Sequence, residues 1–381
     1  MRGCVTRKGN RYYVVVDVGI DDAGKRQRKW HSGYNTKRAA EAALAEIVTS
    51  LNAGVYVPPN KQTFGEYLVD EWLPAIKAST KASTWDSYRR TVQSHLMPRV
   101  GPIPLQAVSP GHLNALYAEL LDGGRVGGGS LSPKTVRNVH VVVRKALGDA
   151  VSWNYVVRNA AASARPPRLT RTALHEHNTW SVEELRAFLD AVQSDRLYAA
   201  WIVAATTGMR RAEVLGLRWR DLDFAAGRIG IRQTLVSVAY ELRFESPKTS
   251  RSRRSVSLDS STVEALRKHR LHQAEERLAW GESYLQSGLV FCREDGSPVH
   301  PERFTQMFDR HVRRQGLRRI RLHDLRHTHA TLALQAGVPA KVVSDRLGHS
   351  SVAFTLDVYS HVVPGLQEDA AQRVADLVFG V

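Results

Sequence analysis

Four stretches of this 381-residue chain hold residue types that could act together on a phosphodiester. They are TTGMRRAEVLGLRWRDLD (206–223), IRLHDLRHTHATLALQAG (320–337), DRLGHSS (345–351) and TLDVYSHV (355–362). Displacement at phosphorus places negative charge on the non-bridging oxygens, and the planar fork of arginine can hold these with two parallel hydrogen bonds. A tyrosine can attack phosphorus and form a covalent phosphotyrosine, which conserves the energy of the broken bond. The set therefore predicts phosphoryl transfer and strand rejoining without a metal or ATP.

In this order, the stretches resemble the catalytic boxes of the tyrosine recombinase family, and in particular those of phage-type integrases. TGMR matches the first catalytic arginine of that family, and HDLRH matches its His-x-x-Arg box. LGHSS matches the third box, and TLDVYSHV matches the segment with the nucleophilic tyrosine. The family also carries a lysine on a β-hairpin between the first two boxes, where this chain has SPKTSRSRRSVSL. The resemblance thus implies six catalytic residues: Arg210, Lys248, His323, Arg326, His349 and Tyr359.

The resemblance also implies a role for each of them. Tyr359 attacks the scissile phosphate, forms a 3′-phosphotyrosyl bond and releases a 5′-hydroxyl. The non-bridging oxygens are held by three residues: Arg210, Arg326 and His349. His323 assists as a donor or base, and Lys248 protonates the leaving 5′-oxygen. The lysine assignment has neighbouring rivals: Arg251, Arg253 and Arg254.

Several of these residues also have a plainer interpretation. Arg210 and Arg211 are adjacent on a predicted helix, so one of them could be a solvated charge, and Glu213 could orient an arginine or form an ordinary helical ion pair. His323, His327 and His329 are close enough in sequence to suggest zinc, but there is no HExxH arrangement and no cysteine cluster. We therefore expect no metal and no cofactor.

Composition and charge limit the class of protein. Lys and Arg outnumber Asp and Glu by 54 to 37, which gives a formal net charge of +17 and points to a polyanionic partner. The two cysteines, Cys4 and Cys292, fit a reducing compartment without disulfides. Neither a membrane span nor a signal-peptide pattern is present, so we expect a cytoplasmic protein that acts on the DNA of a bacterial host.

The elements that must position these residues indicate a multidomain, mainly α-helical protein with small antiparallel sheets. Residues 1–60 predict a small module of three strands with a helix behind them. Arg11–Ile20 is rich in Tyr and Val, a second strand is expected at Lys25–Trp30 and a short third near Tyr34, and a helix should begin at Thr36. The module resembles the arm-type DNA-binding domain of phage integrases, which implies a sheet face set into the major groove. The candidate contacts are Arg11, Lys25, Arg26, Arg28 and Lys29. The alternative is a basic surface without a ligand.

Residues 61–165 predict a helical module that matches the SAM-like core-binding domain of the family. Thr63 and Glu66 form a potential capping box, and Ser83 should start a second helix. Ser109 and Ser132, each followed by proline, should start two more. The last of these helices is amphipathic, and its polar side carries the candidate DNA contacts Lys134, Arg137, Arg144 and Lys145. They could equally be solvated surface charge.

Residues 172–381 predict a mixed α+β catalytic domain after a proline-containing linker. Ser181 and Glu184 should cap its first helix. Arg228–Val238 and Glu241–Leu258 should form a small antiparallel sheet whose turn carries Lys248. An amphipathic segment follows Tyr359, and in this family such a tail often docks on the neighbouring subunit, although it could as easily fold back on its own domain.

We expect a site-specific DNA recombinase that integrates and excises a phage or other mobile element. Two exchanges through a four-way junction need four protomers, so the expected partners are double-stranded DNA at core and arm sites and a homotetramer formed on it. The resemblance also implies a host DNA-bending protein and an excision directionality factor. The alternatives are a type IB topoisomerase, which relaxes supercoils as a monomer, and a catalytically decayed DNA-binding regulator.

Overall fold

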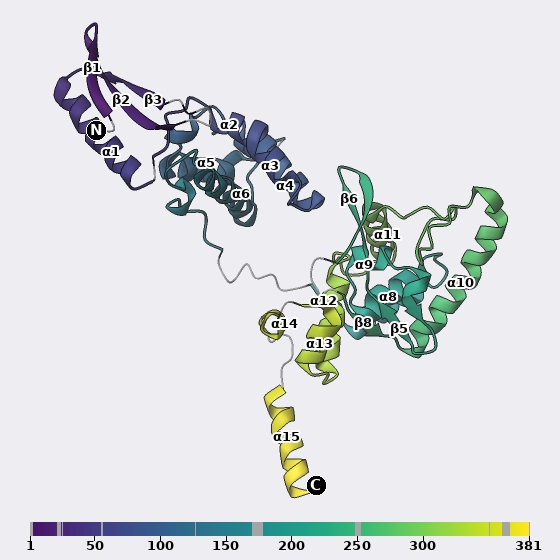
Figure 1. Cartoon of the computed structure of the whole chain (residues 1–381). Coiled ribbons are helices and arrows are strands. Elements are labelled where there is room, and N and C mark those ends of the chain that lie inside the picture. Colours follow the sequence, from purple (N-terminus) through teal and green to yellow (C-terminus); the bar gives the residue numbers. More distant parts are fainter. Residues whose placement is uncertain are drawn as a thin grey trace. The chain divides into compact units, whose positions relative to one another are not determined.

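The computed structural model describes residues 3–20, 24, 26–54, 56–125, 127–169, 178–247, 253–349, 351–359 and 366–380. The chain divides into two compact units, residues 1–173 and 174–381 (Figure 1). The first unit contains β1 (Gly3–Lys8), β2 (Arg11–Ile20), β3 (Arg26–Tyr34), α1 (Lys37–Asn52), α2 (Phe64–Glu66), α3 (Leu73–Lys77), α4 (Ala82–Thr91), α5 (Pro110–Gly123) and α6 (Pro133–Ser152).

The second unit mixes helices with short strands. It contains α7 (Val182–Ala191), α8 (Tyr198–Thr207), α9 (Arg211–Leu215), β4 (Leu222–Asp223), β5 (Arg228–Gly230), β6 (Thr234–Val238), β7 (Glu241–Glu245), β8 (Ser255–Ser257), α10 (Ser260–Trp280), α11 (Pro301–Arg314), α12 (Asp324–Gln335), α13 (Ala340–Leu347), α14 (Val352–Tyr359) and α15 (Leu366–Phe379). No helix among the described residues is both long and apolar enough to cross a bilayer.

The N-terminal sheet has the order β1-β2-β3, with antiparallel neighbours. Side chains alternate between the faces of a strand, so Val14 and Val16 lie together on the face that α1 covers, where they pack with Ala40. Helix α1 begins as predicted, because Thr36 accepts a hydrogen bond from the backbone N–H of Ala39.

The prediction of a three-stranded sheet with a helix is confirmed, but two of its strands were assigned wrongly. The first strand is Gly3–Lys8, which lacks the β-branched and aromatic run that marks β2. The segments expected at Lys25–Trp30 and near Tyr34 are one continuous strand, Arg26–Tyr34. Lys25 itself lies outside the described residues.

The helical module keeps most of its predicted starts. Thr63 and Glu66 form the capping box, and Ser109 and Ser132 cap α5 and α6. The predicted start at Ser83 is wrong, because α4 begins at Ala82. Large apolar side chains from successive helices form the core, among them Phe64, Trp72, Leu96, Leu116 and Val143.

An aromatic core holds the second unit together. The rings of Trp201 on α8 and Phe304 on α11 stack with centroids 4.3 Å apart, and Phe188, Phe308 and Trp180 pack around them. Helix α7 starts at the predicted capping box of Ser181 and Glu184. Helix α8 is buried along nearly its whole length, so its C-terminal end lies within the core of the unit.

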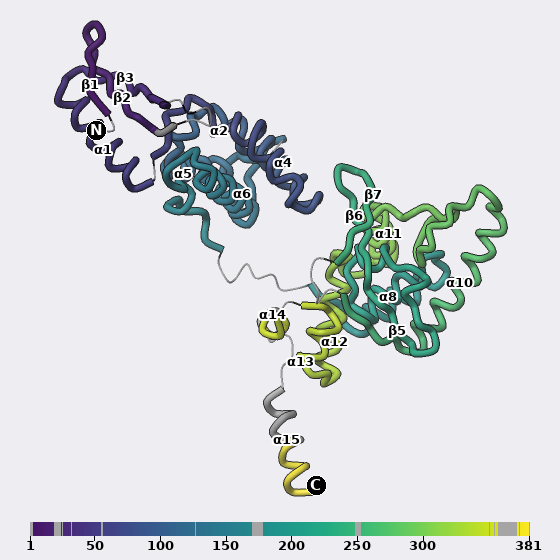
Figure 2. Tube along the Cα trace, in the orientation of Figure 1, coloured from purple at the N-terminus to yellow at the C-terminus, as the bar shows by residue number. Residues whose placement is uncertain are grey.

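The predicted small sheet is two sheets. Strands β4, β5 and β8 form one, and β6 pairs with β7 as a separate hairpin, whose strands run side by side in Figure 2. The turn of that hairpin is Ala239–Tyr240, and both residues have a positive φ. The prediction that both segments form one sheet is therefore wrong. Lys248 follows β7 in the connection to β8 and lies outside the described residues.

Candidate functional site

Arg210 is presented where α8 ends and α9 begins. Gly208 has φ 62°, and a β-carbon there would meet Leu347 Cδ2 at 2.5 Å, so the turn requires glycine. Arg210 was expected within a helix but is the residue that precedes α9. Its Nη1 donates to Glu213 Oε1 at 2.8 Å, while Arg211 points elsewhere and donates to Thr305 at 2.7 Å. The side chain of Arg210 is 38% exposed, so a ligand can reach it.

Arg326 joins the turn after α8 to the end of α13. Its Nη1 donates to the carbonyl of Gly208 and its Nη2 to that of Leu347, both at 2.7 Å. Arg210 donates through Nη2 to the next carbonyl along, that of Gly348, at 3.3 Å. The two arginines, which are far apart in sequence, therefore converge on consecutive peptide groups immediately before His349.

His349 follows the left-handed glycine that ends α13 (Gly348, φ 67°). Its Nδ1 lies 2.8 Å from the hydroxyl of Thr355. Burial lowers the pKa of His349 to about 3, helped by the positive charges of Arg326 and Arg210. The imidazole is therefore neutral at pH 7 and could donate one hydrogen bond to a phosphate oxygen without carrying charge.

His323 immediately precedes α12, so it shares the start of that helix with Arg326. Although the residue remains exposed, partial loss of hydration lowers its pKa, and the charge of Arg326 adds to this effect. Its ring packs edge-on against that of His327, with centroids 5.2 Å apart. Among the described residues, no group of three His, Cys, Asp or Glu side chains is arranged to hold a metal ion.

The two remaining predicted catalytic residues are described less fully. Tyr359 is the last residue of α14, and its side chain lies outside the described part of the structure. Lys248 lies outside it altogether, as does its neighbour Arg251. Of the other rivals for the lysine role, Arg253 is exposed, whereas Arg254 is buried.

Three side chains support the site: Glu213, which the sequence offered as a partner of an arginine, and Arg254 and Thr355, for which it offered no such role. Glu213 is 2% exposed and bonds two arginines, Arg210 and Arg254. Arg254 is buried against partners far along the chain, and Thr355 is buried against His349, which lies between α13 and α14. Nothing in the local sequence signals the roles of Arg254 and Thr355, because hydrophobic periodicity says nothing about long-range polar contacts.

The N-terminal sheet has an open face, defined here as the face that α1 does not cover. Arg11 and Arg28 lie on this face, because Arg28 pairs with Asp17 and both Arg11 and Asp17 alternate with the buried Val14 and Val16. Lys29 pairs with Val16 and so belongs to the other face. Arg26 lies two residues before Arg28 and shares its face.

The open face also carries an exposed aromatic residue. Trp30 pairs with Val15, is 58% exposed, and has its ring edge-on to that of Tyr13 at 6.2 Å. This face therefore combines arginines with aromatic surface, a combination suited to nucleic acid. Trp30 and Tyr13 were not among the residues predicted from the sequence to contact DNA.

The four basic candidates of α6 are all exposed and share one side of the helix, opposite its buried valines. Lys145 is held in an ion pair, with Nζ 2.6 Å from Asp149 Oδ1. Because that charge is already compensated, the other three offer the clearer phosphate-binding surface: Lys134, Arg137 and Arg144.

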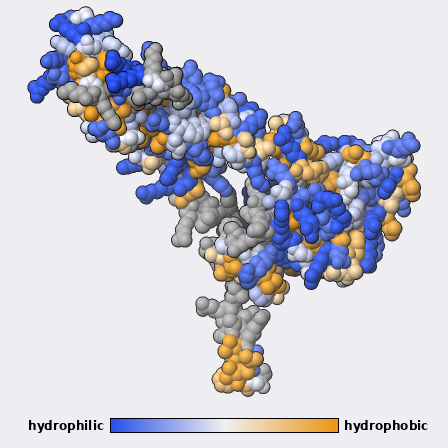
Figure 3. Space-filling model, viewed as in Figure 1, coloured by the Kyte–Doolittle hydropathy of each residue, from blue (hydrophilic) through white to orange (hydrophobic). Residues whose placement is uncertain are grey.

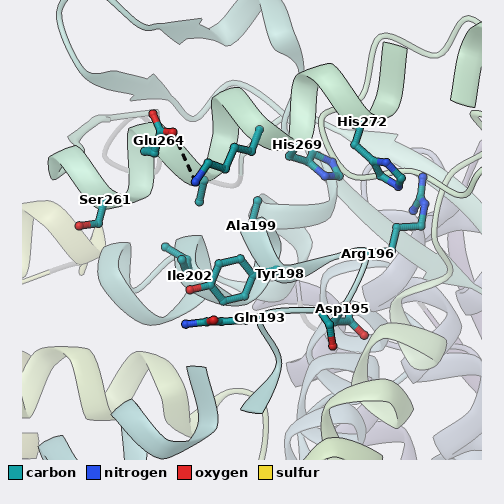
Figure 4. Close-up of a pocket in the computed structure, with 13 residues that line it drawn as sticks. Gln193, Asp195, Arg196, Tyr198, Ala199, Ile202, Ser261, Glu264, His269 and His272 are labelled. Carbon is teal, nitrogen blue, oxygen red and sulfur yellow. Dashed lines mark ion pairs between the residues drawn. The ribbon is translucent and has the colours of Figure 1, made fainter. Parts of the chain in front are cut away.

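A pocket of about 650 Å³ lies elsewhere in the second unit, between the α7–α8 connection and α10 (Figure 4). Gln193 and Tyr198 line one side, and Glu264, His269 and His272 line the other. None of the predicted catalytic residues borders this pocket, and we assign it no part in the reaction.

The fold and this arrangement of arginines and histidines define an enzyme that breaks and rejoins DNA strands, and comparison with protein families identifies its kind. Residues 179–364 match the phage integrase family, residues 5–51 match an arm DNA-binding domain, and residues 63–121 match the N-terminal SAM-like domain of phage integrases. The chain belongs to the phage integrase, or tyrosine recombinase, family. It is a site-specific tyrosine recombinase of the integrase type, from a phage or other mobile element.

Several curated relatives match over almost the whole chain. A tyrosine recombinase XerC-like protein of Caldanaerobacter subterraneus is 29% identical and covers 97% of both chains. The ICEBs1 integrase of Bacillus subtilis is 26% identical and covers 97% of this chain and 98% of its own. An integrase of Streptomyces ambofaciens is 28% identical, with 98% of this chain and 94% of its own covered.

Solved structures show the same fold at lower identity. The Tn1549 transposon integrase, in complex with transposon right end DNA, has a TM-score of 0.68 at 19% identity, and the match covers 82% of this chain and 99% of that one. A lambda integrase dimer bound to a COC′ core site has a TM-score of 0.58 at 16% identity, covering 78% of this chain and 95% of that one.

Proposed function

We propose that this recombinase integrates and excises its element by cleaving DNA through Tyr359, which forms a 3′-phosphotyrosyl link and releases a 5′-hydroxyl. The 5′-hydroxyl of the partner duplex then attacks this link, so no ATP and no metal enter the reaction. The observation that carries the proposal is the convergence of Arg210 and Arg326 on the carbonyls of Gly348 and Leu347, directly before His349.

The proposed roles follow from the chemistry of each group. Arg210, Arg326 and His349 hold the non-bridging oxygens, where preorganised donors stabilise charge that develops in the transition state. His323, with its lowered pKa, can accept the proton of the nucleophile as a neutral imidazole. Lys248 is assigned the role of proton donor to the leaving 5′-oxygen. This assignment rests on the family resemblance alone.

We assign DNA binding to both modules of the first unit. The open face of the N-terminal sheet, with Arg11, Arg26 and Arg28, would contact arm sites, and the basic side of α6 would contact core sites. Two modules on one chain bind bivalently, so their combined affinity exceeds that of either. Strand exchange between two duplexes requires four such protomers, and it involves a host DNA-bending protein and a directionality factor in the bacterial cytoplasm.

The test compares DNA binding and strand cleavage by Tyr359→Phe and by the wild type. The substrate is a duplex with the sequence of the joined ends of the mobile element that carries this gene. We expect the variant to bind this DNA with unchanged affinity and to form no cleaved product. Tyr284→Phe is the matched control, because the Tyr284 hydroxyl contacts Cys292 and lies outside the proposed machinery. Strand cleavage by the Tyr359→Phe variant at the wild-type rate would contradict the assignment of Tyr359 as the nucleophile.

A further inference from the structure

We propose that Arg254 is a positioning residue that holds Arg210 and His349 in the geometry needed for cleavage. The inference rests on the proposed function of those two residues. Arg254 lies directly before β8, and its side chain is only 6% exposed. Burial of an arginine is costly unless the guanidinium is paired, so its partners indicate what it does.

The first partner is Glu213. Arg254 Nη1 donates to Glu213 Oε1 at 3.1 Å and Nη2 donates to Oε2 at 3.0 Å, which is a bidentate pair. The same carboxylate accepts from Arg210, through Nη1 on Oε1 at 2.8 Å and through the backbone N–H on Oε2 at 2.9 Å. Glu213 is therefore a shared anion between a buried arginine and a catalytic one.

The two arginines together control the protonation state of the Glu213 carboxylate. Burial alone would raise the pKa of Glu213, but its hydrogen bonds with Arg254 and the positive charges of Arg254 and Arg210 keep the pKa below its usual value. Without Arg254 the carboxylate would be buried beside one partner, and its orientation toward Arg210 would no longer be fixed.

The second partner is the end of α13. Arg254 Nε donates to the carbonyl of Arg346 at 2.6 Å, and Arg346 Nη1 donates in return to the carbonyl of Ser257 at 2.9 Å. Each arginine thus binds the main chain of the other's segment, which clasps β8 to α13. We call these two hydrogen bonds the arginine clasp.

The clasp lies under the turn that leads to His349. A β-carbon on Gly348 would lie 2.9 Å from Arg254 Nη1, so the guanidinium contacts this turn closely. The side chain of Arg254 therefore fixes two groups. One is the Glu213 carboxylate, which orients Arg210, and the other is the set of peptide groups that precede His349. A lysine has one ammonium group and cannot reproduce the planar fork that meets both partners.

The test uses Arg254→Ala and Arg254→Lys in single-turnover cleavage of the core-site duplex at saturating DNA, with the dissociation constant measured separately. We expect Arg254→Ala to cleave about 10- to 100-fold more slowly, because misplacing catalytic groups by about 1 Å has this effect. DNA affinity should change by less than about threefold, since a buried arginine does not touch phosphates. Arg254→Lys should recover only part of the rate, and added guanidinium should speed up Arg254→Ala.

Two further variants distinguish positioning from general destabilisation. Arg313→Ala removes an exposed arginine of α11 that bonds its own helix at Asp309, and it should cleave at the wild-type rate. In the double variant Arg254→Ala/Glu213→Gln, the losses should be strongly non-additive, because the two residues act as one unit.

The proposal is overturned if Arg254→Lys and Arg254→Ala cleave as fast as wild type, or if they lose affinity while their saturated rate is unchanged. Failure of the wild-type protein to cleave at all is a different result. That outcome would count against the proposed function itself, whereas a normal wild type with normal Arg254 variants would count against the clasp alone.

Discussion

The ring nitrogen Nδ1 of His349 lies 2.8 Å from the hydroxyl oxygen of Thr355, a residue with no exposed surface. Thr355 is on α14, the helix whose last residue is Tyr359. One hydrogen bond therefore ties the histidine of the third box to the helix that ends with the proposed nucleophile. With its pKa lowered to about 3, His349 is neutral at pH 7, and it can donate toward phosphate from Nε2 only if the Thr355 hydroxyl donates to Nδ1.

Thr355→Val should therefore slow cleavage, because it removes the group that fixes the ring and its tautomer. A hydrogen bond of this kind contributes about 1–1.5 kcal/mol, so we expect roughly a tenfold lower single-turnover rate with unchanged DNA affinity. Thr355→Ser keeps the hydroxyl and should stay close to wild type. A Val variant that cleaves as fast as the Ser variant would show that this contact has no part in catalysis.

His329 should make the second unit less stable in mild acid. It packs under the α8 turn against Gly208, and loss of hydration there, with the nearby charge of Arg346, lowers its pKa to about 4. The unfolded chain has the ordinary pKa of about 6.5, so between these values the unfolded state binds more protons and stability falls as pH falls. From pH 7 to pH 5 the loss from this residue should approach about 2 kcal/mol.

Urea unfolding at pH 7 and pH 5 would measure this effect. His329→Asn should be less stable than wild type at pH 7, yet its stability should change less between the two pH values. His272→Asn, at an exposed position of α10, is the control and should keep the wild-type dependence. Equal pH dependence in wild type and His329→Asn would contradict the assignment.

The faces of the N-terminal sheet predict different effects for two adjacent basic residues. Arg28 lies on the open face with Trp30, whereas Lys29 pairs with Val16 on the face that α1 covers. Arg28→Ala should weaken binding to arm-site DNA and lower the slope of log affinity against log salt by about 1, as the loss of one phosphate contact does. Lys29→Ala should change both quantities less, and fluorescence anisotropy over a salt series would measure them. An equal or larger effect of Lys29→Ala would show that the open face is not the binding surface.

Much of the fold could be predicted because its signals are local. Ser109 and Ser132, each followed by proline, marked the starts of α5 and α6, and the capping boxes at Thr63 and Ser181 marked two more helices. Strand β1 lacked such a signal, since only two of its six residues are β-branched and its order depends on pairing with β2. The break at Ala239–Tyr240 was predicted, because the expected segments end at Val238 and begin at Glu241, but local sequence gave no sign that the strands divide between two sheets.

Motifs predicted the candidate catalytic residues, whereas no motif pointed to Arg254 or Thr355 as supports. Arg254 bonds Glu213 and Arg346, which are 41 and 92 residues away, so no local pattern could reveal its function. The amphipathic C-terminal segment was predicted and is α15, which carries exposed apolar side chains near its end, including Val374, Leu377 and Phe379 (Figure 3). The periodicity of a helix shows which side is apolar, but it does not show what that side packs against.

The central claim is that Tyr359 becomes covalently joined to DNA. The most direct measurement uses a suicide duplex nicked beside the core cleavage site. The short fragment that carries the new 5′-hydroxyl then diffuses away, and the adduct accumulates. We predict a denaturant-resistant protein–DNA adduct, and mass spectrometry of the digested adduct should place a 3′-linked nucleotide on the peptide that contains Tyr359. Tight binding of the same duplex without an adduct, or an adduct on another residue, would contradict the account.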